Sequence, residues 1–239
     1  MQQLIILCAS HLKTDENIVQ MREMLDSQMA QTLLCDVYVS YTIESTHSFN
    51  YDNPRVHLIK QPESQLTQFQ HYTRLIAQLW SDGSLHSKNY VIFTDDDDIM
   101  APERNATYFE YIQDGIEVIR LENSVIRFSL DCNIQERSYS IQDALKNSNV
   151  IITYLNPSEY VELCLRGDIL MDFMNLIDDE KAMNYVCDCG FNFKVKDYIC
   201  ANPETTRTII STKPLYYYRY SMFRSVRHKY LEELNNSVD

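Results

Sequence analysis

The first part of the chain places a fully apolar run before a segment with helical spacing. Residues 4–9 are apolar or small at every position, which predicts a strand buried on both faces, near the centre of a sheet. Four apolar side chains then recur at intervals of three and four: Ile18, Met21, Leu25 and Met29. This spacing predicts a helix, and Thr14 is its expected N-cap.

The same alternation continues to residue 100. Residues 33–41, 56–59 and 90–93 are short apolar or β-branched runs that predict strands, and the spacing over 64–80 predicts a helix. We interpret Gln68 and His71 as part of the solvated face of that helix. The order β-α-β-β-α-β favours an α/β fold with a mainly parallel sheet flanked by helices. In such sheets, ligands gather at the carboxyl ends of the strands.

The second half of the chain predicts a smaller set of strands and helices. Strands are predicted at 116–120, 124–130 and 150–154, with edge strands at 191–195 and 214–220. Helices are predicted at 168–176 and 179–187. No repeat or linker divides the chain, so we expect one domain over 1–239, with functional halves at about 1–104 and 105–239.

Composition excludes several classes of protein. The net charge of −13 disfavours a nucleic-acid surface, and the 4 glycines include no glycine-rich phosphate loop. The 7 cysteines are scattered and lack zinc spacing, which favours a reduced compartment. We see no signal peptide and no stretch near the roughly 20 apolar residues of a membrane span. A cytoplasmic protein is expected, in the host cytoplasm if the source is a virus.

Four consecutive aspartates, Asp95 to Asp98, follow the predicted strand at 90–93. Four adjacent carboxylates repel one another and cannot all be buried in the ionised state. A positive partner is therefore needed if they line a cleft. Carboxylate oxygens suit Mg²⁺ or Mn²⁺, which commonly also bind waters and ligand phosphates. The pattern indicates a site for a metal and a diphosphate.

The segment from Val91 to Arg104 resembles the Asp-x-Asp segment of GT-A glycosyltransferases, particularly the family 2 type. The matching residues are Asp95, Asp97, Asp98, Ile99 and Pro102. Residues 162–180 resemble the acceptor-side region of that family, and 214–219 resemble its Tyr-x-Arg ending, so the resemblance covers roughly residues 4–228. It departs from the family at residues 40–44, Ser-Tyr-Thr-Ile-Glu, where the family has a pair of aspartates that reads the nucleobase.

The resemblance implies a GT-A fold and a metal-dependent transfer of a hexose or deoxyhexose from a nucleotide-diphosphate sugar. The implied acceptor is a hydroxyl of a glycan, a lipid-linked sugar or a protein-linked glycan. Asp97 is the chief ligand of Mn²⁺ or Mg²⁺, Asp95 holds the ribose or metal-bound waters, and Asp98 is a further or supporting ligand. Asp96 is expected to point to the other side and to be dispensable.

The resemblance also assigns a base and donor contacts. Asp179 is the preferred base, with Asp178 next, and a base implies inversion of configuration. Alternatively, these two aspartates simply cap the helix that follows them. The residues expected to bind the donor are Asp95, Ser10, Arg74, Arg219, Arg224 and His228.

Three other functions fit parts of the pattern. A haloacid-dehalogenase-like phosphohydrolase also places Asp-x-Asp after an apolar strand, although normally after the first strand. A sugar-nucleotidyltransferase shares the expected fold but carries a glycine-rich loop that is missing here. A non-enzymatic acidic protein that binds cations is the third alternative.

Overall fold

The computed structural model of the 239-residue chain describes residues 3–63, 66–122, 125–129, 151–154, 160–183, 187–212 and 215–220. In the first half the elements are β1 (Leu4–Leu12), α1 (Asp15–Met29), β2 (Asp36–Ile43), β3 (Val56–Lys60), α2 (Gln68–Ser81), β4 (Tyr90–Asp95), β5 (Ile99–Met100) and α3 (Arg104–Gln113). The second half contains β6 (Val118–Glu122), β7 (Val125–Ser129), β8 (Ile151–Tyr154), η1 (Tyr160–Glu162), β9 (Leu163–Arg166), α5 (Gly167–Met174), α6 (Asp179–Ala182), α7 (Cys187–Ala201), β10 (Thr206–Ile210) and β11 (Tyr216–Tyr220).

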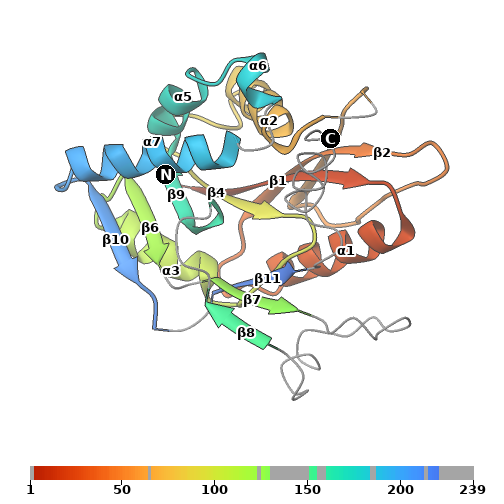
Figure 1. Ribbon diagram of the computed structural model, residues 1–239, viewed down its shortest axis with the longest axis horizontal. Coiled ribbons are helices and arrows are strands. Elements are labelled where there is room, and N and C mark those ends of the chain that lie inside the picture. The colour runs from red at the N-terminus through yellow and green to blue at the C-terminus, as the bar shows by residue number, and fades with distance from the viewer. Residues whose placement is uncertain are drawn as a thin grey trace, which may run out of the picture.

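A seven-stranded sheet forms the centre of the described structure, in the order β10-β6-β9-β4-β1-β2-β3. Its neighbouring strands run parallel except at β9, which is antiparallel to both β4 and β6. Helices α2, α5, α6 and α7 lie on one side of this sheet, and α1 and α3 lie on the other (Figure 1). The prediction of an α/β fold with a mainly parallel central sheet is confirmed.

The central strands are those with unbroken apolar runs. In β1 every side chain except that of His11 is buried, and β4 is buried from Tyr90 to Thr94. Both faces of these strands are covered by helices, so each side chain loses contact with water whichever way it points. The predicted cap of α1 is also confirmed, because the Thr14 side chain accepts a hydrogen bond from the Asn17 amide.

Several elements of the second half differ from the prediction. Residues 191–195, predicted as an edge strand, lie within α7. Phe191 and Val195 are buried at helical spacing, whereas Phe193 between them is 68% exposed, so the apparent alternation was misleading. The predicted helix at 179–187 is wrong in extent, since α6 ends at Ala182 and α7 begins at Cys187. Strands β9 and β10 were not predicted, nor were strand β5 and helix α3 of the first half.

A second sheet, in the order β5-β11-β7-β8, lies beside the first, and Figure 1 shows β7, β8 and β11 below β4. Strand β11 pairs antiparallel with β5, with Tyr216 opposite Met100 and Tyr217 opposite Ile99. It therefore lies between β5 and β7 and is not the edge strand that was predicted. This pairing brings the C-terminal strand next to the residues that directly follow β4.

Replacing Gly167 with alanine is expected to destabilise the fold by about 2–3 kcal/mol. A Cβ at this position would lie 2.3 Å from the His86 carbonyl oxygen, which belongs to the backbone and cannot swing away. Gly190, in the first turn of α7, offers a matched control, because a Cβ there meets nothing within 4 Å. Gly190→Ala should stabilise the protein by about 0.5–1 kcal/mol. Urea unfolding measures both, and equal effects would contradict this packing.

Candidate functional site

The four aspartates lie at the carboxyl end of β4. Asp95 is the last residue of this strand, and its register partner in β1 is Ala9, which directly precedes Ser10. The residues after Asp98 form β5 and pair with β11. The cluster is therefore bordered by β1, α2, η1 and β11, which all supply contacts to it. As expected for a mainly parallel α/β sheet, it occupies the edge where ligands bind.

Asp95 contacts two side chains on the α2 side of the cluster. Gln68, the first residue of α2, donates from Nε2 to Asp95 Oδ1 over 2.5 Å. The Tyr160 hydroxyl, from η1, donates to the same oxygen. The interpretation of Gln68 as part of a solvated helix face is therefore wrong. The first turn of α2 faces the strand ends, so Gln68 joins the site.

Asp96 contacts the end of β1. The Ser10 hydroxyl donates to Asp96 Oδ2 over 2.5 Å, which places the predicted donor-binding Ser10 inside the cluster. Burial, followed by repulsion from Asp97, raises the pKa of Asp96 to about 7. We expected Asp96 to point away from the site, and this expectation fails because its carboxylate turns toward Ser10. That Asp96 is dispensable stays a prediction.

Asp98 is fully buried and its carboxylate is held by β11. The Tyr216 hydroxyl donates to Oδ2 over 2.7 Å, and the Arg219 amide donates to Oδ1 over 2.6 Å. Burial, together with the charges of Asp97 and Asp95, raises the pKa of Asp98 well above its usual range. A carboxylate engaged on both oxygens is suited to fixing the loop, which agrees with a supporting role.

Asp97 differs from its neighbours. Within the described part of the chain, no other residue donates a hydrogen bond to its carboxylate. Burial raises its pKa, and the Arg219 guanidinium acts in the opposite direction. Of the four carboxylates, that of Asp97 is therefore the one that no other described residue engages by a hydrogen bond, and it is available to bind a cation or another ligand.

Two arginines surround the cluster. Arg219 reaches back to α1, where its Nη2 pairs with Glu23 Oε2 over 2.6 Å. Arg104 is 1% exposed and donates from Nη2 to the carbonyl oxygens of Phe93, over 2.9 Å, and Val161, over 2.7 Å. Its guanidinium carbon also lies 5.0 Å from the ring centre of Tyr216. Arg104 therefore ties β4, η1 and β11 together beneath the aspartates.

The other residues expected at the site are not joined to it by the described contacts. Arg74 pairs with Glu63 over 2.6 Å. Asp178 is exposed, accepts a hydrogen bond from the Lys181 amide and pairs with the Lys181 side chain, as in the capping alternative. The Asp179 side chain lies outside the described residues, although its backbone begins α6. Arg224 and His228 also lie outside them.

His71, expected on the solvated side of α2, is fully buried. Its Nδ1 lies 2.9 Å from Ser40 Oγ, and its ring meets that of His11 edge-on, with centres 4.8 Å apart. His11 Nδ1 in turn lies 2.7 Å from Thr42 Oγ1. Burial lowers the pKa of His11 to about 4 and that of His71 to about 3, so both rings are neutral near pH 7.

The donor set of the cluster fits a divalent cation of the Mg²⁺ or Mn²⁺ type. Carboxylate oxygens are the ligands these ions prefer, and adjacent aspartates with raised pKa values gain most from a nearby positive charge. Among the described residues, no three His, Cys, Asp or Glu side chains converge as a complete metal site. A cation held by Asp97 and Asp95 would thus take its remaining oxygens from water or from ligand phosphates.

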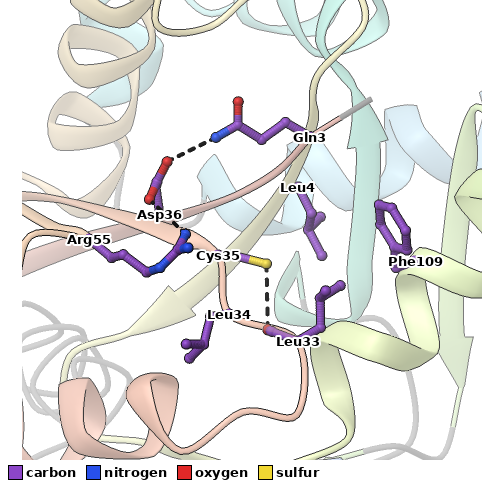
Figure 2. Close-up of a pocket in the computed structure, with 8 residues that line it drawn as sticks. All are labelled: Gln3, Leu4, Leu33, Leu34, Cys35, Asp36, Arg55 and Phe109. Atoms are coloured by element: carbon purple, nitrogen blue, oxygen red, sulfur yellow. Dashed lines mark hydrogen bonds and ion pairs between the residues drawn. The ribbon is translucent and has the colours of Figure 1, made fainter. Parts of the chain in front are cut away.

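A small pocket of about 190 Å³ lies elsewhere, at the opposite edge of the sheet. Figure 2 shows that it is formed where β1 and β2 begin and where α3 passes. Its lining residues are Gln3, Leu4, Leu33, Leu34, Cys35, Asp36, Arg55 and Phe109. One ion pair, between Arg55 and Asp36, crosses its rim over 3.4 Å. The pocket is separate from the aspartates, and we assign it no role.

No family model and no curated protein matches the sequence. Among solved structures, S. aureus TarS 1-349 in complex with UDP-GlcNAc is similar, with a TM-score of 0.56 and 14% identity over 93% of this chain and 60% of that one. Another TarS structure matches with a TM-score of 0.54 and 13% identity over 92% of this chain and 37% of that one. A 4-diphosphocytidyl-2C-methyl-D-erythritol synthase matches with a TM-score of 0.51 and 12% identity over 98% of both chains.

These similarities establish a GT-A-like fold, as the resemblance implied. The fold is shared by a glycosyltransferase crystallised with a nucleotide sugar and by a nucleotidyltransferase. This chain spans only 37–60% of the TarS chains. No described helix is long and apolar enough to cross a membrane.

Proposed function

We propose that this protein is a metal-dependent glycosyltransferase that moves a sugar from a nucleotide-diphosphate sugar to an acceptor hydroxyl. The observation that carries the proposal is that the four aspartates differ in their hydrogen bonds. Asp95, Asp96 and Asp98 each accept hydrogen bonds from other residues, whereas Asp97 accepts none from the described residues. The binding of UDP-GlcNAc by TarS, which shares the fold, supports the choice of a sugar nucleotide as donor.

In this proposal Asp97 and Asp95 hold Mn²⁺ or Mg²⁺, and Asp98 fixes the loop that carries them. The cation, when bound, offsets the charge that develops on the departing nucleoside diphosphate. Arg219 lies at the same edge because its backbone N–H donates a hydrogen bond to Asp98 Oδ1, and the charge of its guanidinium lowers the pKa of Asp97 against the effect of burial. It is therefore the best supported of the donor-binding residues expected from the sequence.

The base is proposed to be Asp179 rather than Asp178. Lys181 lowers the pKa of Asp178, which makes that carboxylate a weaker base. Helix α6, which begins with Asp179, contacts the start of α2, because the Thr67 hydroxyl donates to the Ala182 carbonyl. Thr67 precedes Gln68, the residue that contacts Asp95. A base on α6 would remove the proton of the acceptor hydroxyl and lead to inversion.

Asp179→Asn is therefore expected to lower turnover by about 10² or more while donor affinity is unchanged, because only the proton acceptor is lost. Steady-state kinetics with the best donor measure both quantities. Asp178→Asn is the matched control, and it should change turnover less than about threefold, because it removes the ion pair with Lys181 while asparagine caps a helix as well as aspartate does. Unchanged turnover in Asp179→Asn would move the base elsewhere.

A nucleotidyltransferase is the second candidate, because the synthase matches over 98% of both chains. The products separate the two reactions. A glycosyltransferase releases a nucleoside diphosphate from a sugar nucleotide. A nucleotidyltransferase instead transfers a nucleotidyl group from a nucleoside triphosphate to a sugar phosphate and releases pyrophosphate.

The decisive assay incubates the protein and Mn²⁺ with both substrate sets and quantifies the two products. Transfer to an acceptor is not required, because slow hydrolysis of the donor also releases the nucleoside diphosphate. Release from a sugar nucleotide supports the proposal. Pyrophosphate release alone would replace it with the second candidate, and neither product across a full donor panel would refute both.

A further inference from the structure

The carboxylate of Asp95 belongs to a closed triangle of polar groups. Gln68 Nε2 lies 2.5 Å from Asp95 Oδ1 and 2.6 Å from the Tyr160 hydroxyl oxygen. The Tyr160 hydroxyl completes the triangle by donating to the same Oδ1. Two separate elements, α2 and η1, thus converge on one oxygen atom.

The available protons match this arrangement. A glutamine amide has two N–H donors, so Gln68 supplies one to Asp95 and one to Tyr160. The tyrosine hydroxyl accepts the second and donates its own proton to Asp95. An ionised carboxylate has only acceptors, so both donors act on it without competition.

Both donors are themselves fixed in place. Tyr160 is 4% exposed, and its ring packs edge-on against those of Phe69, Tyr72 and Phe93, with centres 5.9–6.1 Å apart. Gln68 follows Thr67, which caps α2 through a reciprocal pair of bonds with Gln70. The donors therefore meet Asp95 from a rigid aromatic cluster and from the capped start of a helix.

We propose that Tyr160 is a positioning residue for Asp95, with Gln68 as its second donor. The inference rests on the proposed function, in which Asp95 acts on the cation and the donor. A carboxylate rotates about its Cβ–Cγ bond, and two donors on one oxygen restrict that rotation before the ligand arrives. Such preorganisation avoids a reorganisation cost on binding, and outer-shell partners of this kind commonly alter metal affinity 10- to 100-fold, as an approximate range.

Tyr160→Phe tests this role, and Tyr72→Phe is its matched control. Tyr72 is fully buried in the same aromatic cluster, with its ring centre 6.0 Å from that of Tyr160. Its hydroxyl donates to the Thr94 carbonyl over 3.0 Å and also interacts with the Tyr160 hydroxyl, but it donates to no aspartate, so Tyr72→Phe leaves the Tyr160 donor to Asp95 in place. Each variant removes one buried hydroxyl from one cluster, but only Tyr160→Phe removes a donor to Asp95.

The measurement is a titration of each full-length protein with Mn²⁺ alone, in which electron paramagnetic resonance quantifies the free ion. Tyr160→Phe should weaken Mn²⁺ binding about 10-fold, whereas Tyr72→Phe should leave it unchanged within about twofold. In an Asp95→Ala background, Tyr160→Phe should cause no further loss, because the oxygen that accepts from the Tyr160 hydroxyl is no longer present. Gln68→Met, which leaves the aromatic cluster intact, should weaken binding in the same direction.

Equal Mn²⁺ affinities of Tyr160→Phe and Tyr72→Phe would overturn this inference and leave the proposed function standing. An undiminished effect of Tyr160→Phe in the Asp95→Ala background would also overturn it, since the hydroxyl would then act through another group. If the wild-type protein binds no Mn²⁺, the proposed function fails and this inference fails with it.

Discussion

Replacing Asp97 with asparagine is expected to abolish divalent-cation binding and sugar transfer while the fold remains intact. Asp97 is the carboxylate that no other described residue engages by a hydrogen bond, so its removal breaks no such contact. It also lies between charged neighbours, and a neutral amide relieves part of their repulsion. The melting temperature of the metal-free variant should therefore equal or exceed that of the wild type.

The expected loss of transfer activity is large. A bound cation supplies several kcal/mol of charge stabilisation, and about 4 kcal/mol corresponds to roughly 10³-fold in rate. Donor turnover with Mn²⁺ and circular dichroism measure activity and fold separately. Asp96→Asn is the control from the same loop, and it should retain activity within about 10-fold, since the Ser10 hydroxyl can still donate to an amide oxygen. An equal loss in both variants would contradict the division of roles among the aspartates.

The metal-free protein is expected to lose thermal stability as pH rises from 6.5 to 8. Burial raises the pKa of Asp96 to about 7, and burial also raises the pKa values of Asp97 and Asp98. Carboxyl groups of this kind stabilise the folded state fully below their unfolded pKa of about 4. That contribution is lost as pH rises through the folded-state pKa, because the charged carboxylates are buried beside one another.

The buried histidines set the lower limit of this pH window. His11 and His71 have folded-state pKa values of about 4 and about 3, so they stay neutral in the fold at pH 5. The unfolded chain takes up protons on both below about pH 6.5, which destabilises the fold as pH falls. Between about pH 4 and 6.5, rising pH lowers the stability of the fold through the aspartates and raises it through the two histidines. Above pH 6.5 the histidines no longer contribute, so the decline in stability comes from the aspartates.

Scanning calorimetry in EDTA at pH 6.5 and 8 measures this decline. A loss of 1–2 kcal/mol would lower the melting temperature by about 5 °C for a chain of this length. Mg²⁺ should cancel most of the decline, because it binds the ionised carboxylates of the folded state. Asp97→Asn should reduce it, since the Asp97 charge helps to raise the pKa of Asp98. A melting temperature that rises over this range in EDTA would contradict the buried charge assigned to the cluster.

The features that could be predicted from the sequence are those that depend on neighbouring residues, such as apolar runs, helix caps and short motifs. Unbroken apolar runs indicated β1 and β4, Thr14 indicated the start of α1, and the aspartates indicated a site at a strand end. The GT-A-like fold followed from these and from the Asp-x-Asp segment. Strand β9 was missed because its four residues, Leu163–Arg166, carry too little pattern to show that they insert antiparallel between β4 and β6.

The partners of the aspartates could not be predicted in the same way. Tyr160 lies 65 residues from Asp95, in a segment that gave no sign of the site. Tyr216 lies 118 residues from Asp98, in the segment 214–219 that resembles the family's ending, but nothing in the sequence showed that its hydroxyl binds Asp98. Arg104 is the first residue of α3, a helix that was not predicted, and nothing in its neighbourhood in the sequence shows that its side chain is buried. Gln68 offered one signal, its place in the first turn of α2, which points toward the strand ends.

The most direct test of a metal-dependent donor site is a thermal-shift panel of nucleotide sugars, measured with Mn²⁺ and with EDTA, on wild type and Asp97→Asn. At 100 times its dissociation constant, a donor should stabilise the wild type by about 2.7 kcal/mol, or roughly 5–10 °C. We predict that at least one sugar nucleotide produces this shift in the wild type with Mn²⁺, and that none does so in EDTA or in Asp97→Asn. A shift of equal size in EDTA or in Asp97→Asn, or no shift with any donor, would contradict the assignment.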